Sequence, residues 1–240
     1  MPTTLPLSQF PTTTGITLWR GPSAYDGAPI VALAVFHSAN RKTGDMVQTF
    51  ILREGMKPTE AIRNGGDASI CGACPKRRDP ATGKRECYVN VGQSVNVVMR
   101  TYDAGRYPSV PLDVAATYVR GRRVRLGAYG DPAMVPASVW RSFLRFASGH
   151  TGYTHQWRTA SDYRDLCMAS VDSDTERDQA WAMGWRTFRV REASDNVRAG
   201  EVTCPASKEG NMRTQCERCL LCAGNPDRPG LRPGVVIIRH

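Results

Sequence analysis

The sequence predicts an α/β fold, and two observations support this class. Short β-rich runs alternate with segments of helical period, most clearly in the second half of the chain. The 240 residues can bury a substantial core, and their hydrophobic content of 41% is that of an ordinary globular protein. No repeat or linker divides the chain. We therefore expect an irregular arm over residues 1–15 and a single domain over 16–240, built around a largely parallel sheet.

The expected elements follow from apolar periodicity and turn signals. Two β-rich runs at 29–36 and 46–52 are separated by small polar residues that suit a hairpin loop. The segment 173–184 has a Ser/Asp start, an acidic first turn and a terminal glycine, which together indicate a capped helix. Further helices are expected at 94–104, 112–119 and 135–148, the last ending before Gly149. Further strands are expected at 124–131, 152–158, 165–173, 185–191, 200–207 and 234–240.

The net charge is +10, from 32 basic and 22 acidic residues, which suits a polyanionic partner such as nucleic acid or a nucleotide. The arginines are scattered, so a solvated basic surface is an alternative. The N-terminus lacks the basic and apolar regions of a secretory signal, and no apolar run approaches the roughly 18 residues of a membrane span. We expect a cytoplasmic protein with no membrane partner.

Seven of the eight cysteines fall into two clusters with the spacing of metal ligands. Several thiolates that converge on one point repel each other unless a cation holds them. The first cluster reads C-x2-C-x12-C, and its three ligands leave one coordination position open. The second reads C-x11-C-x2-C-x2-C, and its four ligands form a closed site. The predicted metal ligands are Cys71, Cys74, Cys87, Cys204, Cys216, Cys219 and Cys222.

The second cluster has the spacing of ferredoxin-type sites, in which three close thiolates wrap a 4Fe–4S cluster and a remote cysteine completes it. Cys204, followed by Pro205, is the expected remote ligand. Zinc ribbons more often separate two C-x2-C pairs by a longer span, so zinc is the alternative to iron–sulfur here. The first site is more ambiguous, because Cys167 or a histidine would close it around a structural zinc ion. Otherwise Cys167 is a small buried side chain in an apolar strand.

Polar residues end several predicted strands, and in α/β folds ligands bind at the carboxyl ends of strands. Turns are also polar for other reasons, so this pattern supports a site without proving one. Gly127 and Gly130 in the segment GAYGDP would let the backbone approach a cofactor closely, and a tight turn explains them as well. The polar strand-end residues are Asp131, His155, Gln156 and Asp172.

The layout resembles an atypical radical S-adenosylmethionine (SAM) barrel and, more closely, a family of uncharacterised phage and prophage proteins. The phrases that carry the resemblance are CYVNVGQ, RLGAYGDP, GYTHQWR, MASVD, and TCPAS followed by C-x2-C-x2-C. The similarity covers the chain from about Gly21 to its C-terminus. Radical SAM enzymes carry C-x3-C-x2-C, which C-x2-C-x12-C replaces here. The resemblance implies a partial or complete TIM-like barrel of βα units, with an N-terminal β-hairpin and metal-binding loops at 71–87 and 204–222.

The same resemblance implies roles for these residues. The first cysteine cluster would hold an open 4Fe–4S cluster that binds the amino and carboxylate groups of SAM and delivers one electron to its sulfonium. The second would hold an auxiliary cluster, and the polar strand ends would line the cavity above the sheet. The implied catalytic residues are Asp131, His155 and Asp172. The implied cofactor contacts are Gly127, Gly130 and Gln156.

Three hypotheses follow. The first is a phage-type iron–sulfur protein with a radical-SAM-like site that modifies nucleic acid or a nucleotide in the host-cell cytoplasm. The second is a non-catalytic, metal-stapled nucleic-acid-binding protein that acts in phage replication, recombination or host takeover, supported by the basic charge and the cysteine-rich modules. The third is an inert barrel that binds a protein partner the sequence does not identify. Fold analogy alone does not choose among them, because function lies in the site.

Overall fold

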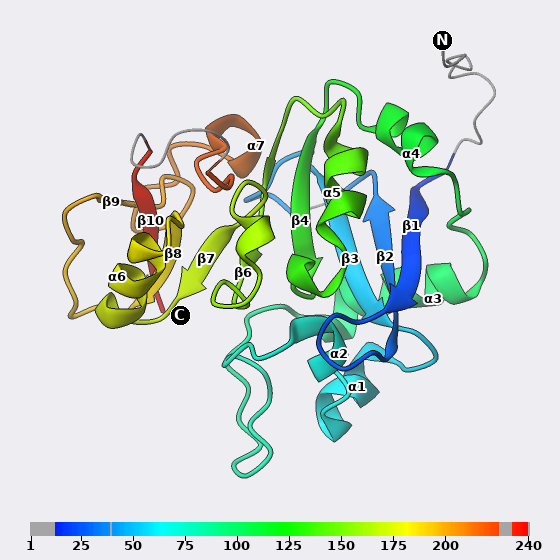
Figure 1. Ribbon diagram of the computed structural model, residues 1–240, viewed down its shortest axis with the longest axis horizontal. Coiled ribbons are helices and arrows are strands. Elements are labelled where there is room, and N and C mark those ends of the chain that lie inside the picture. The colour runs from blue at the N-terminus through cyan, green and yellow to red at the C-terminus, as the bar shows by residue number, and fades with distance from the viewer. Residues whose placement is uncertain (1–12, 39, 226–231, 240) are drawn as a thin grey trace.

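The computed structural model describes residues 13–38, 40–225 and 232–239, and shows a mixed α/β protein with two five-stranded sheets (Figure 1). The first sheet has the order β1-β2-β3-β4-β5, and the second has the order β6-β7-β8-β10-β9. The predicted arm over 1–15 lies outside the described residues up to residue 12. The strands are β1 (Gly15–Pro22), β2 (Pro29–Val35), β3 (Val47–Arg53), β4 (Arg123–Tyr129), β5 (Gly149–Thr151), β6 (Tyr153–Thr154), β7 (Met168–Val171), β8 (Thr187–Arg191), β9 (Glu201–Thr203) and β10 (Gly234–Ile238).

The helices are short, and several confirm the predictions. Those expected at 94–104, 112–119 and 173–184 are present, and the Ser173 hydroxyl caps the last by accepting a hydrogen bond from the Glu176 N–H at 3.1 Å. Within the described ranges, no helix combines the length and apolar character that a membrane span requires. The helices are α1 (Pro58–Asn64), α2 (Ala68–Cys71), α3 (Asn96–Asp103), α4 (Leu112–Tyr118), α5 (Ala137–Leu144), α6 (Asp174–Ala182) and α7 (Cys216–Cys219), with a π-helical turn η2 (Val91–Val95) and 3₁₀ turns η3 (Pro132–Met134) and η4 (Ser161–Tyr163).

The sheets are largely parallel, as predicted. β1, β2 and β3 are antiparallel neighbours, so the two β-rich runs at 29–36 and 46–52 form the expected hairpin. β3, β4 and β5 are parallel, and every pair in the second sheet is parallel. β1 was not predicted, because the run GITLWRGP ends in Gly-Pro and follows a segment rich in Thr and Pro. It pairs with β2 as an edge strand, where a terminal proline is tolerated.

The strand expected at 152–158 is present only as the short β6, Tyr153–Thr154, and a separate strand, β5, precedes it. The helix α5 already ends at Leu144, and Gly149, expected as its stop signal, instead opens β5. β5 pairs with β4, β6 pairs with β7, and only Gly152 separates β5 from β6. A Cβ at Gly152 would lie 2.9 Å from both the Cys167 sulfur and the Leu166 carbonyl oxygen, so only glycine fits at this kink. The two sheets are therefore joined through one bent strand.

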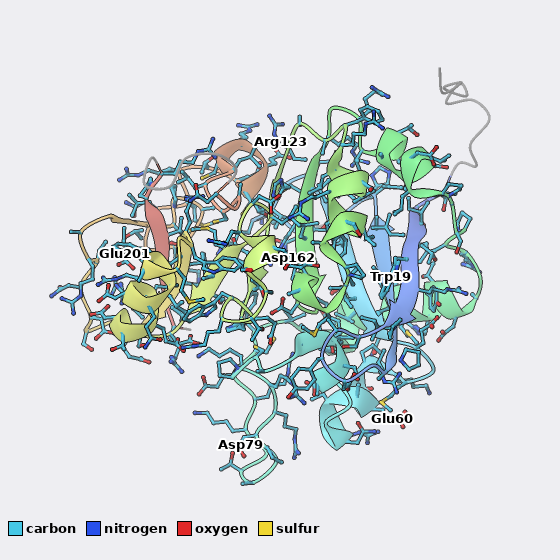
Figure 2. The ribbon with its side chains drawn as sticks, viewed as in Figure 1. Trp19, Glu60, Asp79, Arg123, Asp162 and Glu201 are labelled. Atoms are coloured by element: carbon cyan, nitrogen blue, oxygen red, sulfur yellow. The ribbon has the colours of Figure 1, made fainter. Side chains whose placement is uncertain are left out.

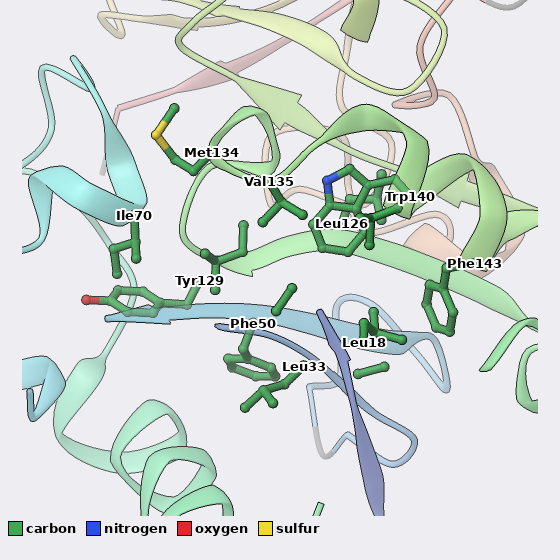
Figure 3. Packing of buried hydrophobic residues seen from close by; sticks show 14 of the residues in the cluster. Leu18, Leu33, Phe50, Ile70, Leu126, Tyr129, Met134, Val135, Trp140 and Phe143 are labelled. Atoms are coloured by element: carbon green, nitrogen blue, oxygen red, sulfur yellow. The ribbon is translucent and has the colours of Figure 1, made fainter. Parts of the chain in front are cut away.

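The main hydrophobic core lies between the first sheet and the helices that cover it (Figure 3). Trp140 and Phe143 of α5 are fully buried, and the Trp140 indole donates a hydrogen bond to the Pro132 carbonyl at 3.0 Å. A second, smaller cluster lies on the second sheet and includes two of the cysteines. Its buried members are Met168, Cys204, Ala206, Cys222 and Val235.

A buried ion pair connects β8, the central strand of the second sheet, to its edge strand β9. The Arg189 guanidinium on β8 contacts the Glu201 carboxylate on β9 through two hydrogen bonds of 2.8 and 2.6 Å. Their side chains are only 2% and 0% exposed. Since β10 lies between β8 and β9, the pair reaches across that strand, and Arg189 also contacts Asp174 at the start of α6 at 3.2 Å.

We predict that Glu201→Gln lowers the free energy of unfolding by about 3–5 kcal/mol, because it leaves a buried guanidinium without its buried charge partner and with only the partly exposed Asp174 beside it. Urea unfolding followed by circular dichroism measures this change. Asp178→Asn is the matched control: it removes an exposed carboxylate, 62% exposed, from the Arg177–Asp178 pair, and Arg177 keeps a contact with Asp174 at 3.8 Å. That variant should lose less than about 1 kcal/mol, and equal losses in both variants would contradict the prediction.

Candidate functional site

A cavity of about 820 Å³ lies against one face of the joined sheets. Much of its wall consists of residues two apart along the strands, as expected for positions on one face of a sheet. β4 contributes Arg125, Gly127, Ala128 and Tyr129. The other strand residues in the wall are Thr151, Tyr153, Ser170, Phe188, Val190, Val235, Ile237 and Ile238, from β5, β6, β7, β8 and β10.

All seven clustered cysteines line this same cavity. The sequence predicted two separate groups of ligands, and the fold brings both groups to one space. Cys167 does not line the cavity and is fully buried, in agreement with its interpretation as a small core residue.

The loop 71–87 folds back on itself, so that Cys87 returns to the start of the loop. The Cys87 N–H donates to the Lys76 carbonyl at 2.9 Å, and Arg78 and Arg85 form an antiparallel bridge. The tip near Asp79 projects from the body of the protein (Figure 2), where the Asp79 carboxylate accepts hydrogen bonds from two backbone N–H groups of the turn. This arrangement explains how twelve residues can separate Cys74 from Cys87 while both cysteines face one cavity.

Ion pairs hold this loop against the strand ends. Lys76 contacts Asp172, which follows β7, at 3.0 Å, and Glu86 at 3.1 Å. Glu86 in turn contacts Arg239, which follows β10, at 2.7 Å. The Arg239 guanidinium also contacts Glu192 at 2.7 Å. These contacts, which we call the loop latch, tie both arms of the first cysteine loop to the carboxyl ends of two strands.

The second cysteine loop is positioned mainly by backbone hydrogen bonds. The Cys216 N–H donates to the Lys42 carbonyl at 3.0 Å, and the Glu217 N–H donates to the Thr43 carbonyl at 3.2 Å. The loop between β2 and β3 therefore supports α7. At the kink between β5 and β6, the Gly152 N–H donates to the Cys222 carbonyl at 3.1 Å. The Tyr153 hydroxyl is hydrogen-bonded to the Cys222 thiol.

Burial and mutual proximity raise the pKa of four of these thiols, Cys71, Cys74, Cys216 and Cys222. Burial is the main cause that raises the pKa of Cys74 to about 12 and that of Cys222 to about 12. The remaining three thiols of the second cluster act in the same direction on Cys222, so they lie within reach of one another's charge. Burial, then Cys74, also raises the pKa of Cys71. Buried thiols that repel each other's charge favour a bound cation, which displaces their protons.

Cysteine thiolates are the donors that both zinc ions and iron–sulfur clusters take. Among the described residues, no three His, Cys, Asp or Glu side chains converge closely enough to hold one metal ion. Four sulfurs around one zinc ion lie about 3.8 Å apart, since each Zn–S bond is about 2.3 Å. An iron–sulfur cubane is larger than one ion and takes its ligands from thiolates alone. Cys71, Cys74 and Cys87 would hold one cluster, and Cys204, Cys216, Cys219 and Cys222 the other.

The three predicted catalytic residues lie together at the cavity edge. One Asp131 carboxylate oxygen accepts a hydrogen bond from the His155 N–H at 2.8 Å, and His155 Nε2 lies 4.0 Å from an Asp172 oxygen. Asp131 and His155 line the cavity, and Asp172 forms an ion pair with Lys76, which also lines it. Burial raises the pKa of Asp131 and lowers the pKa of His155, so both tend toward their neutral forms. Within the described residues His155 Nε2 is buried without a hydrogen-bond partner, as a group that exchanges a proton with a ligand would be.

The predicted cofactor contacts have structural roles in this fold. Gln156 does not line the cavity: its amide donates to the Cys71 carbonyl at 3.1 Å and accepts from the Ala73 N–H at 3.2 Å, which holds the start of the first cysteine loop. Gly127 and Gly130 do line it, with φ of 64° and 82°. A Cβ at Gly130 would lie 2.7 Å from the Ile51 Cβ, so the turn itself requires glycine there.

Sequence reasoning missed Arg125, Tyr153 and Tyr88, which all line the cavity. Arg125 donates a hydrogen bond to the Tyr88 hydroxyl at 3.3 Å, and the Tyr153 ring packs on Phe188 with centroids 4.6 Å apart. The available signal was the period of two along β4, which places Arg125, Gly127 and Tyr129 on one face. In the sequence, Arg125 is hard to single out because it ends the basic run at 120–125.

Comparison of the chain with protein-family models, with curated proteins and with solved structures finds no match. Any statement about activity therefore depends on the cavity and its residues.

We predict that Glu86→Gln opens the loop latch and increases the rate of trypsin cleavage at Lys84 and Arg85 severalfold, because the loop loses its contacts with Lys76 and Arg239. Limited proteolysis with mass spectrometry identifies the cleaved bonds. Glu60→Gln, at an exposed position of α1, is the control for loss of one negative charge. Unchanged cleavage in Glu86→Gln would show that the latch does not hold the loop.

Proposed function

We infer that this chain is a phage-type iron–sulfur protein with a radical-SAM-like site, in which a partial TIM-like barrel encloses two clusters and acts on a nucleotide or nucleic acid. The observation that carries this proposal is the single cavity lined by all seven clustered cysteines. Two unrelated structural zinc sites would have no reason to share one cavity with the inward-facing side chains of six strands.

The strand arrangement supports the barrel part of the proposal. Through the bend at Gly152, the strands follow one another in the continuous order β1-β2-β3-β4-β5/β6-β7-β8-β10-β9, and the run from β3 to β9 is parallel. Within the described residues no ladder pairs β1 with β9, so such a barrel is open. In barrels of this kind the active site lies at the carboxyl ends of the strands. Asp131, His155 and Asp172 follow β4, β6 and β7 in that position.

In this proposal the chain positions the cofactors and controls protons. A 4Fe–4S cluster with an open iron would bind SAM and supply one electron to its sulfonium. The loop latch would hold the three-cysteine loop above the strand ends, and Gln156 would orient its first turn. His155, kept neutral by burial, would exchange a proton with the substrate at Nε2, with Asp131 bound to its backbone. Reduced thiols require a reducing compartment, which is the cytoplasm.

A second candidate is a metal-stapled protein that binds nucleic acid without catalysis. The net charge of +10 favours it. It requires basic side chains free to contact phosphates along an exposed surface, whereas Lys76, Arg189 and Arg239 are engaged in ion pairs. It also predicts bound zinc and DNA affinity that falls steeply with salt, so metal analysis separates the two functions.

We predict that anaerobically purified protein is brown, absorbs broadly near about 400 nm and holds about eight irons per chain, since two cubanes carry four irons each. Cys204→Ala should reduce the iron content to about half, because it removes the remote ligand of one cluster only. Cys167→Ala is the matched control, since that thiol lies outside the cavity, and it should retain all the iron. A colourless protein that holds zinc would exclude the radical-SAM-like function.

A further inference from the structure

Three cations that line the cavity form no ion pair with a carboxylate of the described residues, namely Lys42, Arg85 and Arg125. Lys76, Lys84 and Arg239 form ion pairs with Glu86, and the Arg85 guanidinium donates to backbone carbonyls. Lys42 and Arg125 also line the cavity, and neither forms an ion pair with a carboxylate of the described residues. The charges of Arg125 and Lys42 both lower the pKa of Cys216, against the larger effect of burial, which raises it.

Arg125 is the more constrained of the two. It lies on β4 among the residues that line the cavity, and its side chain is half-buried. Within the described residues, its one hydrogen bond is the 3.3 Å contact with the Tyr88 hydroxyl. Its Nε is buried and has no hydrogen-bond partner in the described part of the chain. A guanidinium has five N–H donors, and leaving such donors unpaired in a buried position costs free energy. A ligand that accepts several of them would remove this cost.

A metal cluster alone does not meet that need. A thiolate at Cys216 would balance part of the positive charge of Arg125 at a distance. Within the described residues, however, no hydrogen bond joins Arg125 to a cysteine sulfur. The planar fork of a guanidinium matches the paired oxygens of a phosphate or carboxylate. Arg125 and Lys42 together therefore suit an oxyanion that carries more than one negative charge, which is a phosphate rather than a carboxylate.

Aromatic rings lie beside this cation pair. Tyr88 is 78% exposed although its hydroxyl contacts Arg125, so its ring is open to contact by a planar ligand. Tyr153 and Phe188 form a tilted aromatic pair in the cavity wall. Bases stack on such rings whatever their sequence. The cavity volume, about 820 Å³, lies in the range of small-molecule sites. Among the described residues that line the cavity, Lys42 and Arg125 are the cations with neither a carboxylate nor a backbone carbonyl as partner, and two such cations suit one phosphate group better than a polymer backbone.

We propose that the cavity binds a single phosphorylated nucleotide, with its phosphate on Arg125 and Lys42 and its base against Tyr88. This inference deepens the proposed function, because it names a mononucleotide as the substrate class of the same cavity. It requires no covalent step, and it is tested by binding alone.

The experiment is isothermal titration calorimetry on anaerobically purified, full-length protein at one fixed salt concentration. The probes are the four common ribonucleoside 5′-monophosphates, the matching nucleosides, inorganic phosphate, and a short single-stranded DNA. At least one monophosphate should bind, and its nucleoside should bind about tenfold more weakly or worse, because it lacks the group that Arg125 recognises. Equal binding of nucleoside and monophosphate, or no binding of any monophosphate, would overturn the proposal.

Variants locate the site. Arg125→Gln should weaken monophosphate binding about tenfold or more, and Arg125→Lys should also weaken it because the charge remains but the fork is lost. Arg123→Gln is the matched control: it removes the same charge from the same strand at an exposed position outside the cavity. Equal losses in Arg123→Gln and Arg125→Gln, or DNA that binds more tightly than every monophosphate, would indicate a surface polyanion site and refute the proposal.

Iron analysis of the same samples separates the two conclusions. Monophosphate binding that depends on Arg125 in a protein without iron supports the nucleotide site and refutes the radical-SAM-like function. About eight irons per chain without monophosphate binding would support the iron–sulfur part of the proposed function and refute the nucleotide site. Circular dichroism melting checks that Arg125→Gln is folded. If it is not, Lys42→Gln replaces it, since Lys42 is an exposed loop residue whose side chain can change without disturbing the core.

Discussion

The structure depends on the close approach of the Gly152 backbone to the Cys167 sulfur and the Leu166 carbonyl oxygen. No side chain fits between this residue and the Leu166–Cys167 segment, so β5 and β6 bend there and each pairs with a different sheet. The bend keeps Thr151, Tyr153 and His155 on one cavity wall. Its N–H also holds the Cys222 carbonyl, which fixes the second cysteine loop to the junction of the sheets. Gly152 is therefore both the junction of the two sheets and the residue that binds the second cysteine loop.

Charge determines how the rest of the site is held. The first cysteine loop has little apolar surface of its own, and ion pairs from Lys76 and Glu86 tie it to the strand ends. The second sheet is fastened by Arg189 and Glu201 across β10. Removing one partner of such a buried pair costs free energy of unfolding, because the other partner is left charged and uncompensated in the low-dielectric interior. The basic excess of the sequence is thus partly internal, and it gives no simple measure of affinity for nucleic acid.

Local signals predicted local structure well. The hairpin of β2 and β3 and the capped helix α6 depend on neighbouring residues, such as the Ser173 cap of the Glu176 N–H. The strand expected at 152–158 proved much shorter, because β5 before it pairs with β4, β6 pairs with β7, and the chain turns after Thr154. Gln156 appeared to be a cofactor contact, yet its amide binds the backbone of Cys71 and Ala73, which are far away in the sequence.

The sequence by itself determined the donors: seven cysteines in two spacings, with polar residues after several strands. Spacing is a local property, and so it identifies a chelating loop without any knowledge of the fold. Only the tertiary structure decided that both loops face one cavity, that Arg125 points into it, and that Asp131, His155 and Asp172 meet at its edge. Those relations depend on pairing between strands distant in the chain, because parallel neighbours are joined by crossovers whose path no short segment encodes.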